Sequence, residues 1–334
     1  MSIRVAVIGA AGHIGSAIVE ELEANPGFHP VALVRNDLVA RMQSLRCGDV
    51  RVGSASDRRD ADRVLGDCDA VINCALPRGP SREVRRINEA IVDQIARQPR
   101  VRAVVQFSTV AVYGSRIGSD PGVVRPRPET SYGRAKLDLE RYARRACAAA
   151  GLRYYVLRLG HVYGAGQWVS QQILEDLTRA EFGLPEDGGT PSNAVWVGHI
   201  ASVVRRILVD EPLSGTYDLT DTPNKTWREL YDLHSQIFGL PHAPPLPKDA
   251  AAMMRCALAG GTRTATLLRQ SLRQIVNGSA SAFVEGASDL RQIIEPALTK
   301  LPALVEERLR RVHVRSKVKA ELSSLPPRHR HLPA

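Results

Sequence analysis

The stretch Ile3-Arg-Val-Ala-Val-Ile8, followed by Gly9-Ala-Ala-Gly12-His-Ile-Gly15, decides the fold of this chain. Its first part is apolar and β-branched, which predicts a buried strand, and a helical pattern follows the glycines over residues 16–24. Gly9 can form the tight turn. Gly12 has no side chain, so its backbone can approach a pyrophosphate closely, and Gly15 lets the helix pack closely on the strand. The helix N-terminus would offer N–H groups to the phosphates, so this stretch predicts a dinucleotide site.

A second apolar run, Val31-Ala-Leu-Val34, follows at the spacing of a parallel βαβ unit and ends in Arg35. In a dinucleotide-binding βαβ unit, the residue at the end of the second strand contacts the ribose of the adenosine. An acidic side chain there accepts hydrogen bonds from a 2′-hydroxyl, whereas arginine pairs with a 2′-phosphate and stacks on adenine. Arg35 therefore favours NADP as the cofactor, with NAD as the alternative. The competing interpretation is that Arg35 is a solvated residue at a strand end.

The composition is that of a globular protein, with 44% hydrophobic and 24% charged residues among 334. The chain enters a strand at once, and no apolar run approaches the roughly 18 residues of a membrane span. Five cysteines without CxxC spacing predict reduced, mostly buried thiols in a cytoplasmic protein, with no disulfide framework and no metal site.

The positive charge is concentrated at the C-terminus. Residues 308–334 carry six arginines and two lysines against one glutamate, so +7 of the formal net charge of +10 lies in this tail. A solvated C-terminal face explains this distribution better than a DNA-binding surface, and we expect no nucleic-acid partner.

Apolar runs alternate with helical patterns along the first half of the chain, which predicts an α/β fold with a doubly wound parallel sheet of the Rossmann type. The runs lie at residues 50–52, 69–75, 101–107 and 154–159, with helices expected at 37–45, 81–97 and 132–149. Residues 194–197 and 215–219 are expected to return to this sheet. We therefore predict an NAD(P)-binding domain over residues 1–165, with its sheet rejoined by about 193–220. Residues 166–192 and 221–334 would form a smaller, mostly helical substrate lobe with the basic tail, and the active site would lie between the two.

Two residues on the expected helix at 132–149 are candidates for proton transfer. Tyr132 and Lys136 are four positions apart, so both side chains lie on one helix face. A tyrosine with a pKa of about 10 is a poor base at neutral pH, and a nearby ammonium lowers that pKa. Thr109, or else Ser108, ends a strand and could bond the oxygen that is oxidised or reduced. Taken alone, the YxxxK spacing also fits an ordinary amphipathic helix.

Taken together, these motifs resemble the extended short-chain dehydrogenase/reductase family, which includes NAD(P)-dependent epimerases and dehydratases. The resemblance runs from Ile3 to about Leu230. It is carried by the glycine turn and by DAVINCA from Asp69, STVAVYG from Ser108, YGRAK from Tyr132, RLGHVYGAG from Arg158, VWVGHIA from Val195 and GTYDLT from Gly215.

The resemblance implies a role for each matching residue. Thr109 takes the catalytic hydroxyl position, Tyr132 the acid/base position, and Lys136 the position that lowers the tyrosine pKa and binds the nicotinamide ribose. The dinucleotide would be lined by Gly9, Gly12, His13, Ile14, Gly15, Arg35, Ala75, Tyr132 and Lys136.

Departures from the family pattern concern the substrate. Val110 and Ala111 replace the Asp-Glu pair usual in 4,6-dehydratases, which disfavours that reaction. His161 stands where many members have asparagine, and Ser192 lies near the position of a frequent diphosphate-binding arginine. The expected substrate contacts are Ser108, His161 and Tyr163.

The expected activity is hydride transfer at a secondary alcohol or ketone, with 4-keto reduction or epimerisation of a nucleotide-linked sugar as the leading reaction. One alternative is a ketoreductase or alcohol dehydrogenase for a small molecule without a nucleotide. Another is a dinucleotide-binding sensor or scaffold without turnover. By resemblance, we expect a homodimer that pairs through the helices near residues 81–97 and 132–149.

Overall fold

The computed structural model describes residues 2–77, 79, 81–116, 125–178 and 182–245. Helices expected at residues 248–258, 262–276 and 302–322, together with the basic tail, lie outside the described residues. The chain groups into two compact units. The first comprises Met1–Tyr163 and Pro191–Lys225, and the second comprises Gly164–Thr190 and the described residues from Thr226 onward.

Within the described residues, seven parallel strands of the first unit form one sheet in the order β3-β2-β1-β4-β5-β6-β9. The strands are β1 (Ile3–Ile8), β2 (Phe28–Val34), β3 (Asp49–Val52), β4 (Ala70–Asn73), β5 (Ala103–Thr109), β6 (Arg153–Leu159) and β9 (Gly215–Leu219). The predicted doubly wound parallel sheet is confirmed. Its strand order reverses between β1 and β4, and in such sheets ligands bind at the carboxyl ends of the strands beside this point.

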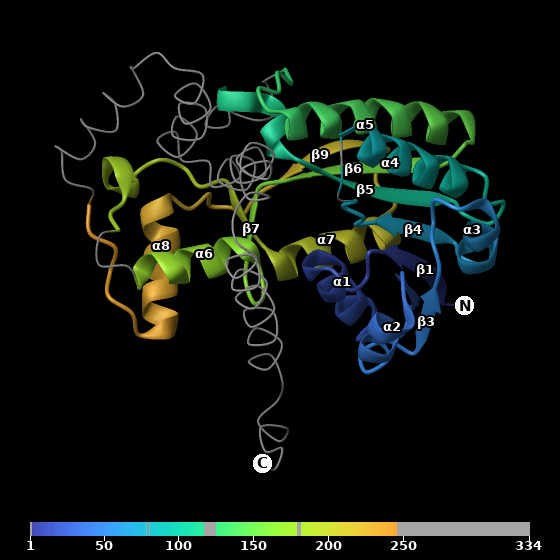
Figure 1. Cartoon of the computed structure of the whole chain (residues 1–334), viewed down its shortest axis with the longest axis horizontal. Coiled ribbons are helices and arrows are strands. Elements are labelled where there is room, and N and C mark those ends of the chain that lie inside the picture. Colours follow the sequence, from blue (N-terminus) through green and yellow to red (C-terminus); the bar gives the residue numbers. More distant parts are fainter. Residues whose placement is uncertain (1, 78, 80, 117–124, 179–181, 246–334) are drawn as a thin grey trace, which may run out of the picture. The chain divides into compact units, whose positions relative to one another are not determined.

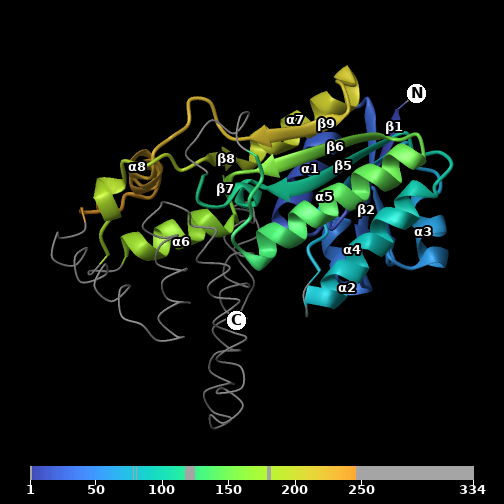
Figure 2. The same ribbon diagram turned by 90° about the horizontal axis from the view of Figure 1, so that it is seen from above.

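Helices cover both faces of this sheet (Figure 1). One apolar core joins the strands to α1 (His13–Glu23) and α7 (Val197–Asp210). A second core joins the other face to α3 (Arg58–Leu65), α4 (Ser81–Ala96) and α5 (Ser131–Ala149). Because both faces are covered, every residue of β5 is buried, as its continuous apolar run predicts. Figure 2 shows α4 and α5 together on one face of the sheet.

The helices begin where polar residues satisfy their first N–H groups. Asn36 accepts a hydrogen bond from Val39 N at 3.0 Å and caps α2 (Asp37–Gln43). Asp57 accepts from Asp60 N at 3.1 Å and caps α3. Thr130 caps α5, so this helix begins one residue before the expected Tyr132. These caps follow from the preference of short polar side chains for the N-cap position.

One expected strand pairing is wrong. We expected residues 194–197 to return to the main sheet, but β8 (Ala194–Trp196) pairs with β7 (His161–Tyr163) in a separate two-stranded parallel sheet. The place beside β6 is taken by β9, which confirms the expectation for residues 215–219. Gly160 turns the chain out of β6 at a point where a Cβ atom would lie 1.8 Å from Asn193 O. This close approach brings β7 and β8 together away from the main sheet.

The described part of the second unit consists of α6 (Trp168–Leu177), a short 3₁₀ helix, η2 (Pro185–Gly188), and α8 (Trp227–Phe238). The Tyr231 hydroxyl of α8 donates to Asp176 of α6 at 2.8 Å, and the Phe182 ring stacks on Tyr231 at 5.3 Å between centroids. The described residues contain no helix long and apolar enough to cross a membrane.

Candidate active site

The glycine turn between β1 and α1 has the geometry that its sequence predicts. Gly9 has a φ of +79°, a conformation that favours glycine, and Gly12 N donates to Gly9 O at 2.9 Å. A Cβ atom on Gly15 would lie only 2.3 Å from Gly9 O. The third glycine is therefore required for close packing of the helix on the turn, as expected.

The start of α1 suits the phosphates of a dinucleotide. Gly12 occupies the N-cap position, where it has no side chain to cap the helix, and the first turn contains no acidic residue. His13 and Ile14 form this first turn. A negative group here would meet backbone N–H groups and the positive end of the helix dipole. The residues of this stretch thus fit a dinucleotide.

The end of β4 lies against the same turn. A Cβ atom on Gly9 would lie 3.1 Å from Cys74 O, and Ala75 N donates to Asn73 Oδ1 at 3.1 Å. The structure thereby brings the predicted cofactor residues Gly9 and Ala75 together at the switch point. Arg35 follows directly after β2, is exposed, and forms no ion pair within the described part of the chain. Its guanidinium is available for a ligand at this edge of the sheet.

Tyr132 and Lys136 lie on one face of α5, as their spacing predicts. The Lys136 ammonium lies 5.8 Å from the centroid of the Tyr132 ring, and its Nζ donates to Phe107 O of β5 at 3.3 Å. A Cβ atom on Gly133 would lie 2.7 Å from Ala111 O, so the helix approaches the backbone just after Thr109. Both side chains are therefore held beside the carboxyl end of β5.

Thr109 is the last residue of β5, and its Oγ1 accepts a hydrogen bond from Ala111 N at 3.2 Å. The chain continues into the 3₁₀ helix η1 (Val110–Arg116), whose Val110 and Val112 pack with Leu137 of α5. This apolar contact fixes the strand end against the helix that carries Tyr132 and Lys136.

The environment of Lys136 changes its acidity. Burial lowers the pKa of its ammonium from 10.5 to about 8, although the negative charges that Cys74 and Glu140 can carry raise it again in part. Lys136 is therefore mainly protonated at neutral pH. The Lys136 side chain thus places a positive charge beside the Tyr132 ring.

The three expected substrate contacts are buried and hydrogen-bonded. The Ser108 hydroxyl donates to Glu140. His161 Nδ1 lies 2.6 Å from Ser192 O, and burial lowers the pKa of its imidazole. The Tyr163 hydroxyl donates to Asp221 at 2.7 Å. Ser108 lies on β5, whereas His161 and Tyr163 lie on β7, so the structure places them in separate networks.

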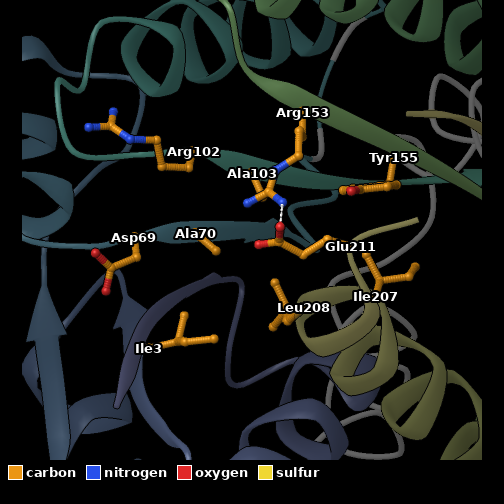
Figure 3. Close-up of a pocket in the computed structure, with 10 residues that line it drawn as sticks. All are labelled: Ile3, Asp69, Ala70, Arg102, Ala103, Arg153, Tyr155, Ile207, Leu208 and Glu211. Atoms are coloured by element: carbon orange, nitrogen blue, oxygen red, sulfur yellow. Dashed lines mark ion pairs between the residues drawn. The ribbon is translucent and has the colours of Figure 1, made fainter. Parts of the chain in front are cut away.

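Sequence reasoning missed two residues of the Ser108 network, Glu140 and Arg158. The sequence could have indicated both residues. Glu140 follows Lys136 by one helical turn and so lies on the same helix face, and Arg158 is the first residue of the RLGHVYGAG motif. A cavity lies at the amino edge of the sheet, where the starts of β1, β4, β5 and β6 meet the end of α7 (Figure 3). The ion pair of Arg153 and Glu211 lines it, and it is remote from the carboxyl ends of the strands. No cluster of metal-ligating side chains occurs in the described ranges.

The comparison with known proteins agrees with this geometry. Residues 5–186, more than half of the chain, match the model of the NAD dependent epimerase/dehydratase family. The chain belongs to this family. It is therefore an enzyme that works with a nicotinamide dinucleotide. The predicted resemblance to the extended short-chain dehydrogenase/reductase family is confirmed.

Individual members of the family are distant relatives. The 2′-dehydrokanamycin reductase of Streptomyces kanamyceticus is 25% identical over 271 residues, which cover 75% of this chain and 71% of the reductase. The UDP-glucose 4-epimerase of Thermus thermophilus, in complex with NAD, has a TM-score of 0.57 at 25% identity over 73% of this chain and 88% of its own. The dTDP-glucose 4,6-dehydratase of Bacillus anthracis has a TM-score of 0.60 at 18% identity over 74% of this chain and 88% of its own, and it shares the fold.

Proposed function

We propose that this enzyme reduces a ketone of a sugar, or interconverts sugar epimers through such a ketone, with NADP(H) as the hydride carrier. The observation that carries this proposal is the Lys136 ammonium beside the Tyr132 ring at the carboxyl end of β5. Thr109 ends the same strand, and the glycine turn lies at the carboxyl end of β1 in the same sheet. This set of groups suits proton transfer at an oxygen next to a carbon that exchanges hydride.

Each residue has one task in this reaction. When bound, the dinucleotide supplies or accepts the hydride. In the direction of reduction, the Tyr132 hydroxyl gives its proton to the carbonyl oxygen, and the Lys136 ammonium stabilises the resulting phenolate. The Thr109 hydroxyl holds the same oxygen in position. Gly9, Gly12, His13, Ile14 and Gly15 receive the pyrophosphate, and Ala75 lines the dinucleotide beside them.

The preference for NADP over NAD rests on Arg35. An exposed guanidinium at the end of β2 can pair with a 2′-phosphate in two hydrogen bonds and stack on the adenine ring. An exchangeable NADP(H) also suits net reduction better than epimerisation, because epimerases commonly retain their dinucleotide as a recycled oxidant.

A nucleotide-linked sugar is the leading substrate class, because the related Thermus protein is a UDP-glucose 4-epimerase. Reduction or epimerisation at C4 is favoured over dehydration. The two residues after Thr109, Val110 and Ala111, are apolar and buried, so they provide no acid/base pair for loss of a hydroxyl group.

A sugar ketone without a nucleotide is the second candidate. It is favoured by the similarity to 2′-dehydrokanamycin reductase over 75% of the chain. It is also favoured by Ser192, which is fully buried and donates its hydroxyl proton to Lys225 O at 2.7 Å. Position 192 therefore presents no positive charge to a diphosphate. The expected substrate contacts Ser108, His161 and Tyr163, the homodimer and the cytoplasmic location stay predictions.

The first experiment identifies any nucleotide that the purified protein retains and then titrates it with NADPH and NADH, followed by protein fluorescence. We expect tighter binding of NADPH, and loss of this preference in Arg35→Ser but not in Arg41→Ser, which removes an arginine from the neighbouring α2. Keto-sugars are then tested with and without a nucleotide. Tightly retained NAD would overturn the NADP proposal in favour of a self-recycling epimerase. Cofactor binding without turnover on either substrate class would favour the sensor or scaffold.

A further inference from the structure

A buried carboxylate lies one helical turn beyond Lys136. The Glu140 side chain on α5 is buried, with 1% of its surface exposed, and its two oxygens accept hydrogen bonds from Arg158 Nε at 3.0 Å and Nη2 at 2.7 Å. Its Oε1 also accepts the Ser108 hydroxyl proton. Glu140 thus connects α5 with β5 and β6, the two strands beneath that helix (Figure 1).

The network continues to the edge of the sheet. Arg158 Nη1 donates to the Tyr113 hydroxyl at 2.8 Å, and the guanidinium lies 5.0 Å from the centroid of the Tyr113 ring. The Tyr113 hydroxyl in turn donates to both oxygens of Asp218 on β9, at 2.7 and 2.8 Å. Burial raises the pKa of the Asp218 carboxyl above its usual value, although its Tyr113 and Arg158 neighbours oppose this.

Stability alone does not explain such a network. Charges taken out of water lose their hydration, and an apolar cluster of similar volume often stabilises a core equally well or better. A buried ionic network therefore calls for another reason, and its position supplies one. Ser108 precedes Thr109 on β5, and Glu140 follows Lys136 on α5, so Glu140 links the two segments that carry the reacting groups.

The charge of Glu140 also acts on Lys136. The titratable groups that face the Lys136 ammonium are Cys74, which directly follows β4, and Tyr132 and Glu140 of α5. Burial raises the pKa of the Cys74 thiol, so Cys74 is neutral at physiological pH. Of these groups, Glu140 is the one that carries a negative charge, which the Arg158 guanidinium at 2.7–3.0 Å partly balances.

We propose that Glu140 is a positioning residue for the reaction: it holds the end of β5 against α5 and electrostatically supports the Lys136 ammonium. This inference rests on the proposed function for its catalytic meaning. Its physical content, an effect of Glu140 on Lys136, can be measured without turnover.

The test measures Lys136 directly in Glu140→Gln. This substitution keeps the size and an acceptor for Ser108 but removes the charge. The protein is labelled briefly with acetic anhydride at a series of pH values, and the modification of each lysine is read by mass spectrometry of its peptide. We expect the inflection for Lys136 to fall by about one pH unit. Lys225, which is paired with Asp221 at 3.6 Å, is the internal control and keeps its inflection.

Asp138→Asn is the matched control, because Asp138 lies on the same helix but its side chain is 62% exposed. This variant should leave both inflections unchanged. If cofactor-dependent turnover is found, the alkaline limb of kcat/KM should shift with Lys136 in Glu140→Gln and not in Asp138→Asn. A wild-type protein without turnover would contradict the proposed function while leaving the labelling result to decide the role of Glu140.

Glu140→Gln leaves the buried Arg158 without its carboxylate partner, so folding is checked by circular dichroism. If Glu140→Gln does not fold, the same labelling is done on Glu140→Gln/Arg158→Met, in which no buried charge of this pair remains. The Lys136 inflection is again expected below that of the wild type. An unchanged inflection in either folded variant would overturn the proposal.

Discussion

Burial of the Lys136 ammonium lowers the free energy of unfolding, although the proposed reaction requires this group. The lowered pKa means that the folded state binds fewer protons than the unfolded state between about pH 8 and 10.5. Stability therefore rises with pH across this window, and the cost of the buried ammonium is present in full below pH 8. In the proposed mechanism the ammonium is required, so we expect activity to fall with rising pH across the same window.

We predict that Lys136→Met raises the free energy of unfolding at pH 7 by on the order of 1 kcal/mol while it removes turnover. Phe107 O keeps a partner in this variant, since Gln106 Nε2 also donates to it at 3.1 Å. Urea unfolding at pH 7 and pH 10 measures the effect, and the gain should shrink at the higher pH. A variant less stable than the wild type at pH 7 would show that the ammonium stabilises the fold.

Gly15 is the residue of the turn with the least room. We predict that Gly15→Ala lowers the free energy of unfolding by about 1–3 kcal/mol and weakens cofactor binding, because the new methyl group would displace the Gly9 carbonyl. Gly27→Ala is the control, since a Cβ atom there would meet nothing within 4 Å. Urea unfolding and cofactor titration of both variants measure the difference. Equal behaviour of the two would contradict the close packing of α1 on the turn.

At the scale of the element, the first turn of α5 matters most, because it holds Tyr132. Thr130 Oγ1 accepts from Gly133 N at 3.0 Å at the start of this helix, and Thr226 Oγ1 accepts from Glu229 N at 3.2 Å at the start of α8. The two caps use the same chemistry on helices with different tasks, which makes them a matched pair.

We predict that Thr130→Ala and Thr226→Ala each lower the free energy of unfolding by about 1 kcal/mol. Only Thr130→Ala should also lower kcat, because fraying of α5 releases Tyr132. Chemical unfolding and steady-state kinetics of both variants separate the two effects. A similar loss of kcat in Thr226→Ala would mean that cap removal acts through general stability.

Elements with a local signal could be predicted from the sequence, whereas their pairing depended on contacts that the sequence does not display. The run at residues 194–197 has the pattern of a strand that could join either sheet. In the structure β9 takes the place beside β6, and residues 194–196 pair with β7. Ser108 has a hydroxyl group that suits a substrate contact, but this hydroxyl donates its hydrogen bond to Glu140, a residue 32 positions away. Helical periodicity places Glu140 on the same face as Lys136, but it does not pair Glu140 with Ser108.

At the scale of the whole molecule, the parallel sheet follows from alternating apolar and helical segments, which the sequence shows clearly. The grouping of the candidate residues follows from the same sheet, because the carboxyl ends of parallel strands meet at one edge. That rule brings the glycine turn, Ala75 and Thr109 to the same edge of the sheet. The substrate remains a proposal, since the residues expected to contact it lie in buried networks and most of the C-terminal third of the chain is outside the described residues.

The measurement that tests the central claim most directly is turnover by Tyr132→Phe, with NADPH binding measured on the same preparation. This substitution removes one hydroxyl group and keeps the ring beside Lys136. We predict that kcat falls by at least about a hundredfold while the Kd for NADPH is unchanged. Retention of full activity would contradict the assignment of Tyr132 as the acid/base and, with it, the proposed mechanism.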